Sequence, residues 1–170
     1  IDLNRITWLA KRKYWKNNFF HIVSTSKWLF NCASNSKLFS ASKHFLIRYP
    51  LETKKFWKPI HKNVAREALG LPQDKYLILM GADGGTTNPR KGADLMFESI
   101  SNIGKIANFE TELIIFGQSD PINPSKWSQK VHWLGNVNDD RILALAYSAA
   151  DVMIVPSRQE AFGQTATESL

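Results

Sequence analysis

The segment YLILMGADGGTTNPRKG, residues 76–92, decides the fold, because an apolar run leads through a glycine-rich loop into the start of a helical pattern. The run Tyr76–Gly81 is typical of a strand covered on both faces. The loop ends in Arg90 and Lys91, where backbone N–H groups and a helix N-terminus would add positive potential to the lysine charge. Because it is neither a Walker A sequence nor a GxGxxG fingerprint, a phosphate site and a plain turn both remain open.

The same order of elements recurs along the chain. Short apolar runs alternate with stretches that place apolar residues three and four apart, which predicts an α/β domain around a parallel sheet. The predicted strands are 45–49, 76–81, 112–116, 131–134 and 152–155. The predicted helices are 63–69, 92–107, 139–149 and 163–170. Gly70 is expected to end the first helix, and Asn138 or Asp139 to cap the third.

The formal charge of +7 on 170 residues is unevenly placed. Residues 1–62 hold 13 Lys and Arg against two acidic residues, whereas residues 63–170 hold nine against 13. A composition near globular averages excludes disordered, collagen-like and disulfide-framework proteins. The single cysteine, Cys32, has no disulfide partner, fits a reducing, cytoplasmic compartment and is expected in the core.

No apolar stretch of the sequence reaches the ~18 residues of a membrane span, so we expect no crossing of a bilayer. The sequence starts at Ile1 rather than Met and stops at Leu170 inside a helical pattern. We therefore expect a fragment of a longer protein.

Two further predicted strands are followed by glycine at the carboxyl edge, where an open parallel sheet binds its ligands. Gly117 follows the strand at 112–116 and would let a ligand approach the backbone closely. Gly135 opens the turn after the strand at 131–134, and Val137 lies in that turn. An ordinary turn explains both glycines equally well.

The loop after the last predicted strand carries two glutamates, Glu160 before a helix and Glu168 within it. Five helical residues at ~1.5 Å each separate them by roughly 7–8 Å along the axis. The N–H groups of Phe162, Gly163 and Gln164 lie at the helix start, where no intrahelical acceptor exists. A carboxylate, amides and a second carboxylate would suit a hexose, a diphosphate and a ribose, the order of groups in a nucleotide sugar. Alternatively, Glu160 pairs with the helix dipole and Glu168 is solvated.

Six short motifs occur in one order along the chain. They are Ser-Lys-Trp-Leu at 26–29, Arg-Lys-Gly at 90–92, Ile-Ile-Phe-Gly at 114–117, Leu-Gly-Asn-Val at 134–137, Ala-Asp-Val with Val-Pro-Ser at 150–157, and two glutamates with seven residues between them. In this order, from about Ser24 to Leu170, the sequence resembles the C-terminal half of a GT-B glycosyltransferase of family 4. The resemblance implies a Rossmann-like parallel sheet with helices on both faces.

The resemblance also implies a role for each candidate residue. Glu160 would hydrogen-bond the donor sugar and Lys91 would stabilise the leaving diphosphate, so these two would carry the chemistry. Glu168 would take the ribose diol, the amides at Phe162, Gly163 and Gln164 the sugar or diphosphate, the Gly117 loop the nucleotide, and the backbone of Gly135 to Val137 the base. Ala82 stands where many members carry a second phosphate-binding arginine, and Arg90 is its candidate substitute.

The function implied is transfer, with retention, of a hexose or N-acetylhexosamine from a nucleoside-diphosphate sugar, UDP or GDP linked. The acceptor would be a saccharide or a polyprenyl-diphosphate-linked saccharide of a bacterial surface polysaccharide such as O-antigen, capsule or lipopolysaccharide. No metal and no cofactor are expected, since the four histidines are scattered. The family's catalytic histidine and acceptor site would belong to an N-terminal domain.

Residues 1–43 would then end that N-terminal domain or cross between domains, and residues 44–170 would form a truncated donor-binding domain. The cations and aromatic residues at the front could face an anionic membrane surface, on the inner face of the cytoplasmic membrane. Two alternatives stay open, a nucleic-acid or polyanion-binding α/β module and a sugar-nucleotide epimerase. Without an RRM, KH or helix-turn-helix signature, nucleic acid is not an expected partner.

Overall fold

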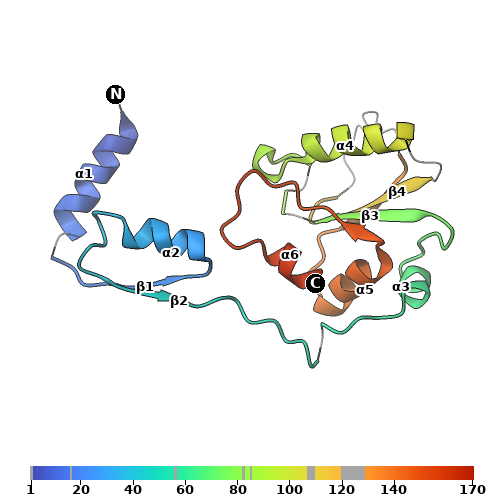
Figure 1. The fold of residues 1–170 in the computed structure, drawn as a ribbon, viewed down its shortest axis with the longest axis horizontal. Coiled ribbons are helices and arrows are strands. Elements are labelled where there is room, and N and C mark those ends of the chain that lie inside the picture. Colours follow the sequence, from blue (N-terminus) through green and yellow to red (C-terminus); the bar gives the residue numbers. More distant parts are fainter. Residues whose placement is uncertain are drawn as a thin grey trace. The chain divides into compact units, whose positions relative to one another are not determined.

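The chain forms two compact units, Ile1–Pro50 and Leu51–Leu170, in a computed structural model (Figure 1). The structure describes residues 2–15, 17–55, 57–81, 83–84, 86–106, 110–119 and 129–170. None of the helices in these ranges is both long and apolar enough for a membrane crossing.

The N-terminal unit is a small α/β arrangement. Its elements are α1 (Leu3–Trp15), β1 (His21–Ser24), α2 (Lys27–Ser34) and β2 (Lys43–Leu46). β1 and β2 pair in parallel, and the Ser26 hydroxyl caps α2 by accepting from the Leu29 N–H at 3.2 Å. Trp15 packs against the rings of Phe20 and Phe39, with centroids 5.7 and 5.9 Å away.

Two expectations for this part of the chain are corrected. The strand expected at 45–49 in the donor-binding domain lies at Lys43–Leu46 and pairs with β1, within the compact unit Ile1–Pro50. Cys32 is exposed rather than in a core, because α2 has no buried residue among those described.

The C-terminal unit is built on a four-stranded parallel sheet in the order β5-β4-β3-β6. Its strands are β3 (Tyr76–Gly81), β4 (Thr111–Phe116), β5 (Val131–Gly135) and β6 (Val152–Met153), and its helices are α3 (Lys62–Ala68), η1 (Pro89–Lys91), α4 (Ala93–Ile106), α5 (Asp140–Ala149) and α6 (Gln164–Glu168). The chain moves outward from β3 through β4 to β5 and then returns to the other side of β3. Doubly wound sheets bind ligands at such a reversal, beyond the carboxyl ends of the strands.

Helices cover both faces of this sheet, as predicted (Figure 1). Leu77 and Leu79 of β3 pack with α3 and α5, whereas Ile78 and Met80 pack with α4. This alternation explains why the apolar run of β3 is almost continuous, since side chains of a strand point to opposite faces in turn.

Local signals set the ends of the helices as expected. Gly70 adopts φ +64° after α3, and Leu71 N–H donates to the Arg66 carbonyl at 2.8 Å, which is a Schellman ending. The Asp139 carboxylate caps α5 by accepting from the Arg141 N–H at 2.9 Å. β6 is shorter than the predicted 152–155: Ile154 N–H still donates to Leu79, but Pro156 has no N–H to continue the ladder.

Arg66 ties together the amino-terminal edge of the sheet. Its side chain, only 4% exposed, donates to the carbonyls of Pro72, Gln73, Lys75 and Ala149 and to the Asp151 carboxylate at 2.7 Å. Asp151 also accepts from the Leu77 N–H at 2.7 Å and from Lys62 at 2.6 Å. Burial acts to raise the pKa of Asp151, but these hydrogen bonds and the charges of Arg66 and Lys62 outweigh it, so the pKa is lowered.

Replacing Arg66 by methionine is expected to lower the free energy of unfolding by about 3 kcal/mol, because four carbonyls and a partly buried carboxylate lose their shared donor. Urea unfolding followed by circular dichroism measures the loss. The matched control is Arg141→Met, which removes an ion pair with Asp139 whose side chains are 76% and 44% exposed. Its expected cost is under about 1 kcal/mol, and equal losses for the two variants would contradict a structural role for Arg66.

Candidate functional site

Backbone hydrogen bonds join the loops that follow three neighbouring strands. Gly84 N–H, after β3, donates to the Gly117 carbonyl at 3.2 Å, and Gly117 N–H, after β4, donates to the Gly135 carbonyl at 2.8 Å. Gln118 adds a side-chain link, because its Oε1 accepts from the Thr86 hydroxyl at 3.0 Å. The predicted Gly117 and Gly135 therefore lie together at the carboxyl edge. Gln118 was not a sequence candidate, since the pairing joins residues 32 positions apart.

A cavity of about 490 Å³ opens beside these loops. It is lined by Asp83, Phe116, Gly117, Asn136, Val137, Asn138, Leu143, Gln164, Thr165 and Glu168. Four predicted site residues, from loops and helices far apart in the sequence, thus share one cavity: Gly117, Val137, Gln164 and Glu168. Its lining is mixed, with the apolar Phe116, Val137 and Leu143 beside amide and carboxyl groups.

Lys91 and Glu160 meet at the switch point of the sheet. Lys91 ends η1 after β3, Glu160 lies in the loop after β6, and Lys91 Nζ is 2.7 Å from Glu160 Oε1. Burial acts to raise the pKa of Glu160, but hydrogen bonds from Lys91 and Ser157 and the charges of Lys91 and Arg90 outweigh it, so the pKa is lowered. The two predicted catalytic residues form an ion pair that keeps Glu160 ionised.

Arg158 fastens the two loops that bear this ion pair. Its backbone N–H donates to the Arg90 carbonyl at 2.8 Å, and its guanidinium donates to the Pro89 carbonyl at 3.0 Å and to both Asp94 oxygens at 2.6 and 2.8 Å. These hydrogen bonds lower the pKa of Asp94 to about 2. The sequence contained no signal for this pair, which spans 64 positions, and the exposed Arg90 takes part through its carbonyl.

Gly92 allows the same two loops to touch. It adopts φ +66°, and a Cβ built on it would lie 2.1 Å from the carbonyl oxygen of Pro156. Only glycine fits both the left-handed backbone and this approach.

Both carboxylate oxygens of Glu168 accept hydrogen bonds. Tyr147 Oη, from α5, donates to Oε2 at 2.8 Å, and Gln164 Nε2 donates to Oε1 at 2.8 Å. The predicted alternative of a merely solvated Glu168 is therefore wrong. Tyr147 was not a predicted site residue, since its pairing with Glu168 joins residues 21 positions apart.

Phe162 and Gly163 immediately precede α6, with Gly163 in a left-handed conformation at φ +78°. The helix is shorter than the expected 163–170, and its first turn closes with Thr167 N–H donating to the Gly163 carbonyl. Ala82, where the resemblance expects an arginine, lies outside the described residues. Among the described side chains, no three His, Cys, Asp or Glu groups are close enough to share a metal ion.

The sequence and structure are similar to those of known glycosyltransferases. The family model described as glycosyl transferases group 1 matches residues 75–170. Granule-bound starch synthase 1 of Ipomoea batatas is 26% identical over 73% of this chain and 21% of its own length. D-inositol 3-phosphate glycosyltransferase of Xylanimonas cellulosilytica is 32% identical over 64% of this chain and 27% of its own length.

Among solved structures, the catalytic domain of starch synthase IV from Arabidopsis thaliana, bound to ADP and acarbose, has a TM-score of 0.56 at 17% identity. The match covers 89% of this chain and 37% of that one. The likeness shows a shared α/β fold. The chain spans about a quarter of the length of the two curated relatives.

Replacing Gly92 by alanine is expected to destabilise the C-terminal unit by clearly more than the same change at Gly70. Gly70 has nearly the same φ, +64°, but a Cβ there meets nothing within 4 Å, so Gly70→Ala isolates the backbone strain of about 1–2 kcal/mol. At Gly92 the clash with Pro156 adds to this strain and separates Lys91 from Glu160. Urea unfolding measures the first effect, and a rise in the pKa of Glu160, followed by carboxyl NMR, measures the second. Equal costs at both glycines, with the pKa of Glu160 unchanged, would contradict the close packing of the loops.

Proposed function

The chain belongs to the glycosyl transferases group 1 family, and from this membership we propose that it supplies the donor-binding half of an enzyme that transfers a sugar from a nucleoside-diphosphate sugar. The observation that carries the proposal is that the Lys91–Glu160 ion pair and the Glu168 cavity both lie at the carboxyl edge of one parallel sheet. The match to a structure bound to ADP supports a nucleotide ligand.

Lys91 and Glu160 are suited to opposite sides of the bond that breaks. The Lys91 ammonium has three N–H donors, so donation to Glu160 leaves two for a diphosphate. Negative charge grows on the diphosphate as the sugar departs, and a cation already held in place stabilises that charge. The ionised Glu160 accepts hydrogen bonds from hydroxyls of the donor sugar.

The cavity beyond this pair suits the nucleoside. Glu168 offers acceptors to the ribose diol, while Val137 and the neighbouring backbone lie where a base would pack. Three finer features rest on the family 4 resemblance and belong to the proposal. They are retention at the transferred hexose or N-acetylhexosamine, a UDP- or GDP-linked donor, and a saccharide or polyprenyl-diphosphate-linked acceptor of a bacterial surface polysaccharide.

Titration calorimetry of the 170-residue chain against UDP, GDP, ADP and AMP, with and without magnesium, tests the donor site. We expect saturable binding that favours one nucleoside diphosphate and does not require the metal. Glu168→Ala is expected to weaken that binding by about 1–3 kcal/mol, the value of hydrogen bonds to a charged group. The control is Glu98→Ala, an exposed carboxylate on α4, which should leave affinity unchanged. A uniform, salt-sensitive response to all four nucleotides would replace the proposal with a general polyanion-binding module.

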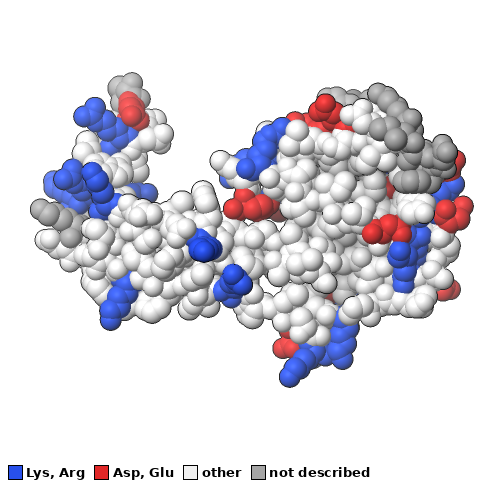
Figure 2. Space-filling view, viewed as in Figure 1, with Lys and Arg blue, Asp and Glu red and all other residues white. Residues whose placement is uncertain are grey.

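We extend the proposal to a membrane contact made by the N-terminal unit. Helix α1 has no buried residue among those described, and Leu3, Ile6 and Leu9 are 72%, 53% and 48% exposed. The same helix carries Arg5, Lys11, Arg12 and Lys13 and no acidic residue, and Figure 2 shows basic side chains gathered over α1. Exposed apolar and cationic groups on one helix are typical of segments that lie in the headgroup region of an anionic bilayer.

Co-sedimentation with vesicles tests this contact. The chain is expected to pellet with phosphatidylcholine vesicles that contain phosphatidylglycerol and to stay in solution with phosphatidylcholine alone. Ile6→Glu should abolish pelleting, whereas Val64→Glu, an equally exposed apolar residue on α3, should not. Equal pelleting with and without the anionic lipid, or pelleting of the Ile6→Glu variant, would contradict the membrane contact.

A further inference from the structure

Tyr147 packs against the core and hydrogen-bonds Glu168, a residue of the candidate nucleotide cavity. Its ring packs edge-on against Phe116, the last residue of β4, with centroids 5.8 Å apart at 86°. Trp57, from the segment before α3, lies on another side with its ring centroid 5.8 Å away. Elements from three parts of the C-terminal unit thus set the position of one phenol ring.

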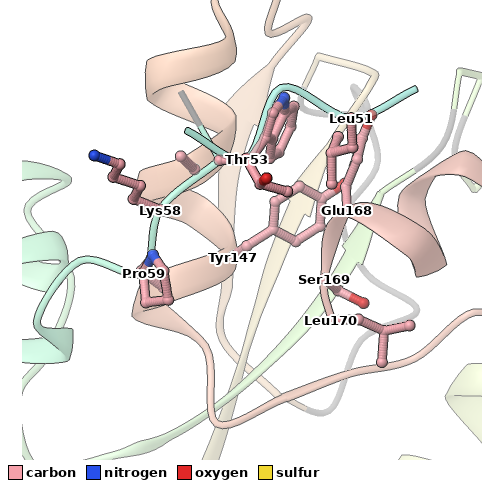
Figure 3. Close-up of a pocket in the computed structure, with 11 residues that line it drawn as sticks. Leu51, Thr53, Lys58, Pro59, Tyr147, Glu168, Ser169 and Leu170 are labelled. Carbon is pink, nitrogen blue, oxygen red and sulfur yellow. The ribbon is translucent and has the colours of Figure 1, made fainter. Parts of the chain in front are cut away.

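The hydroxyl of this ring donates a hydrogen bond to Glu168. A second cavity, of about 300 Å³, has both residues in its lining, together with Trp57 and Lys58 (Figure 3). Glu168 also lines the larger cavity at the strand ends, so this one residue borders both cavities. Burial, the hydrogen bond to Glu168 and the negative charge of Glu168 all raise the pKa of Tyr147. The phenol therefore keeps its proton and donates a hydrogen bond to the carboxylate.

The hydrogen bonds of Glu168 leave acceptor sites for a diol. An ionised carboxylate has two oxygens and about four acceptor sites. Tyr147 uses one on Oε2 and Gln164 uses one on Oε1, so each oxygen keeps a site for a further donor. Two vicinal hydroxyls are the donors that match two adjacent oxygens with one site each.

We propose that Tyr147 is the positioning residue of Glu168, holding its carboxylate so that each oxygen presents one acceptor to the two hydroxyls of a bound ribose. The proposal rests on the proposed function, since it names the residue that prepares the nucleoside subsite. Of the two holding contacts, the one from Tyr147 is the more rigid, because its half-buried ring packs against the core while the bond from Gln164 is exposed. Removing the phenol oxygen leaves Glu168 with the exposed hydrogen bond from Gln164 but without the one from Tyr147, so its carboxylate is held less firmly.

The test compares Tyr147→Phe with the unaltered chain on two probes, the nucleoside diphosphate that binds most tightly and its 2′,3′-dideoxy form. Loss of one hydrogen bond to a charged group is expected to weaken the ribose form about five- to tenfold and to leave the dideoxy form within about twofold. Tyr14→Phe removes the same atom from an exposed tyrosine of the N-terminal unit and should change neither affinity. Unchanged dideoxy binding also shows that the variant is folded.

Two results would overturn the assignment. If Tyr147→Phe binds both forms as the unaltered chain does, the hydroxyl does not act on the diol, and if both forms weaken equally, its role is only structural. Glu168→Ala separates these results from failure of the proposed function. Should Glu168→Ala lose the preference for the ribose form while Tyr147→Phe keeps it, the ribose role of Glu168 stands and the positioning role of Tyr147 falls. Should Glu168→Ala keep that preference, the ribose role falls and takes the positioning role with it.

Discussion

The parallel pairing of β3, with β4 on one side and β6 on the other, is the constraint on which the C-terminal unit depends. Because these strands run in one direction, the loops that follow them leave from one edge. The return of the chain from β5 to the far side of β3 then sets the loop after β6 beside the loop after β3. Lys91 and Glu160, 69 positions apart in sequence, meet for this reason.

Charged residues differ in burial and in hydrogen bonding between the two edges of the sheet. At the amino-terminal edge, Arg66 is almost fully buried and its hydrogen bonds go to five acceptors of the chain itself. That arrangement stabilises the fold and leaves the guanidinium little capacity for a ligand. At the carboxyl edge, Lys91, Glu160 and Glu168 each make contacts that orient the group, and within the part of the chain that the structure describes some of their donors or acceptors stay unused. The structural charge is buried and its hydrogen-bonding groups are occupied by the chain, whereas the candidate binding charges are less buried and keep free hydrogen-bonding groups among the described residues.

The two units also differ in how they bury apolar surface. The C-terminal unit packs aliphatic side chains on both faces of a sheet, whereas the N-terminal unit relies on a few aromatic contacts around Trp15. Its helix α1 leaves apolar and basic side chains exposed together, and the exposure of Cys32 on α2 follows from the same thin packing. The excess of positive charge seen in the sequence therefore coincides with the least buried part of the chain.

The amino-acid sequence by itself determined the strands β3, β4 and β5 to within about a residue, together with their burial on both faces. It also determined the helix ends at Gly70 and Asp139. These features could be predicted because apolar periodicity, glycine at positive φ and side-chain caps act over a few residues. It also indicated which loops bear the candidate site. Only the tertiary structure decided that the strand at Lys43–Leu46 belongs to the N-terminal unit, that Arg158 pairs with Asp94, and that Tyr147 holds Glu168. These pairings depend on strand order and on which helix lies over which strand. A local sequence pattern does not indicate which residues, separated by tens of positions, become neighbours in the fold.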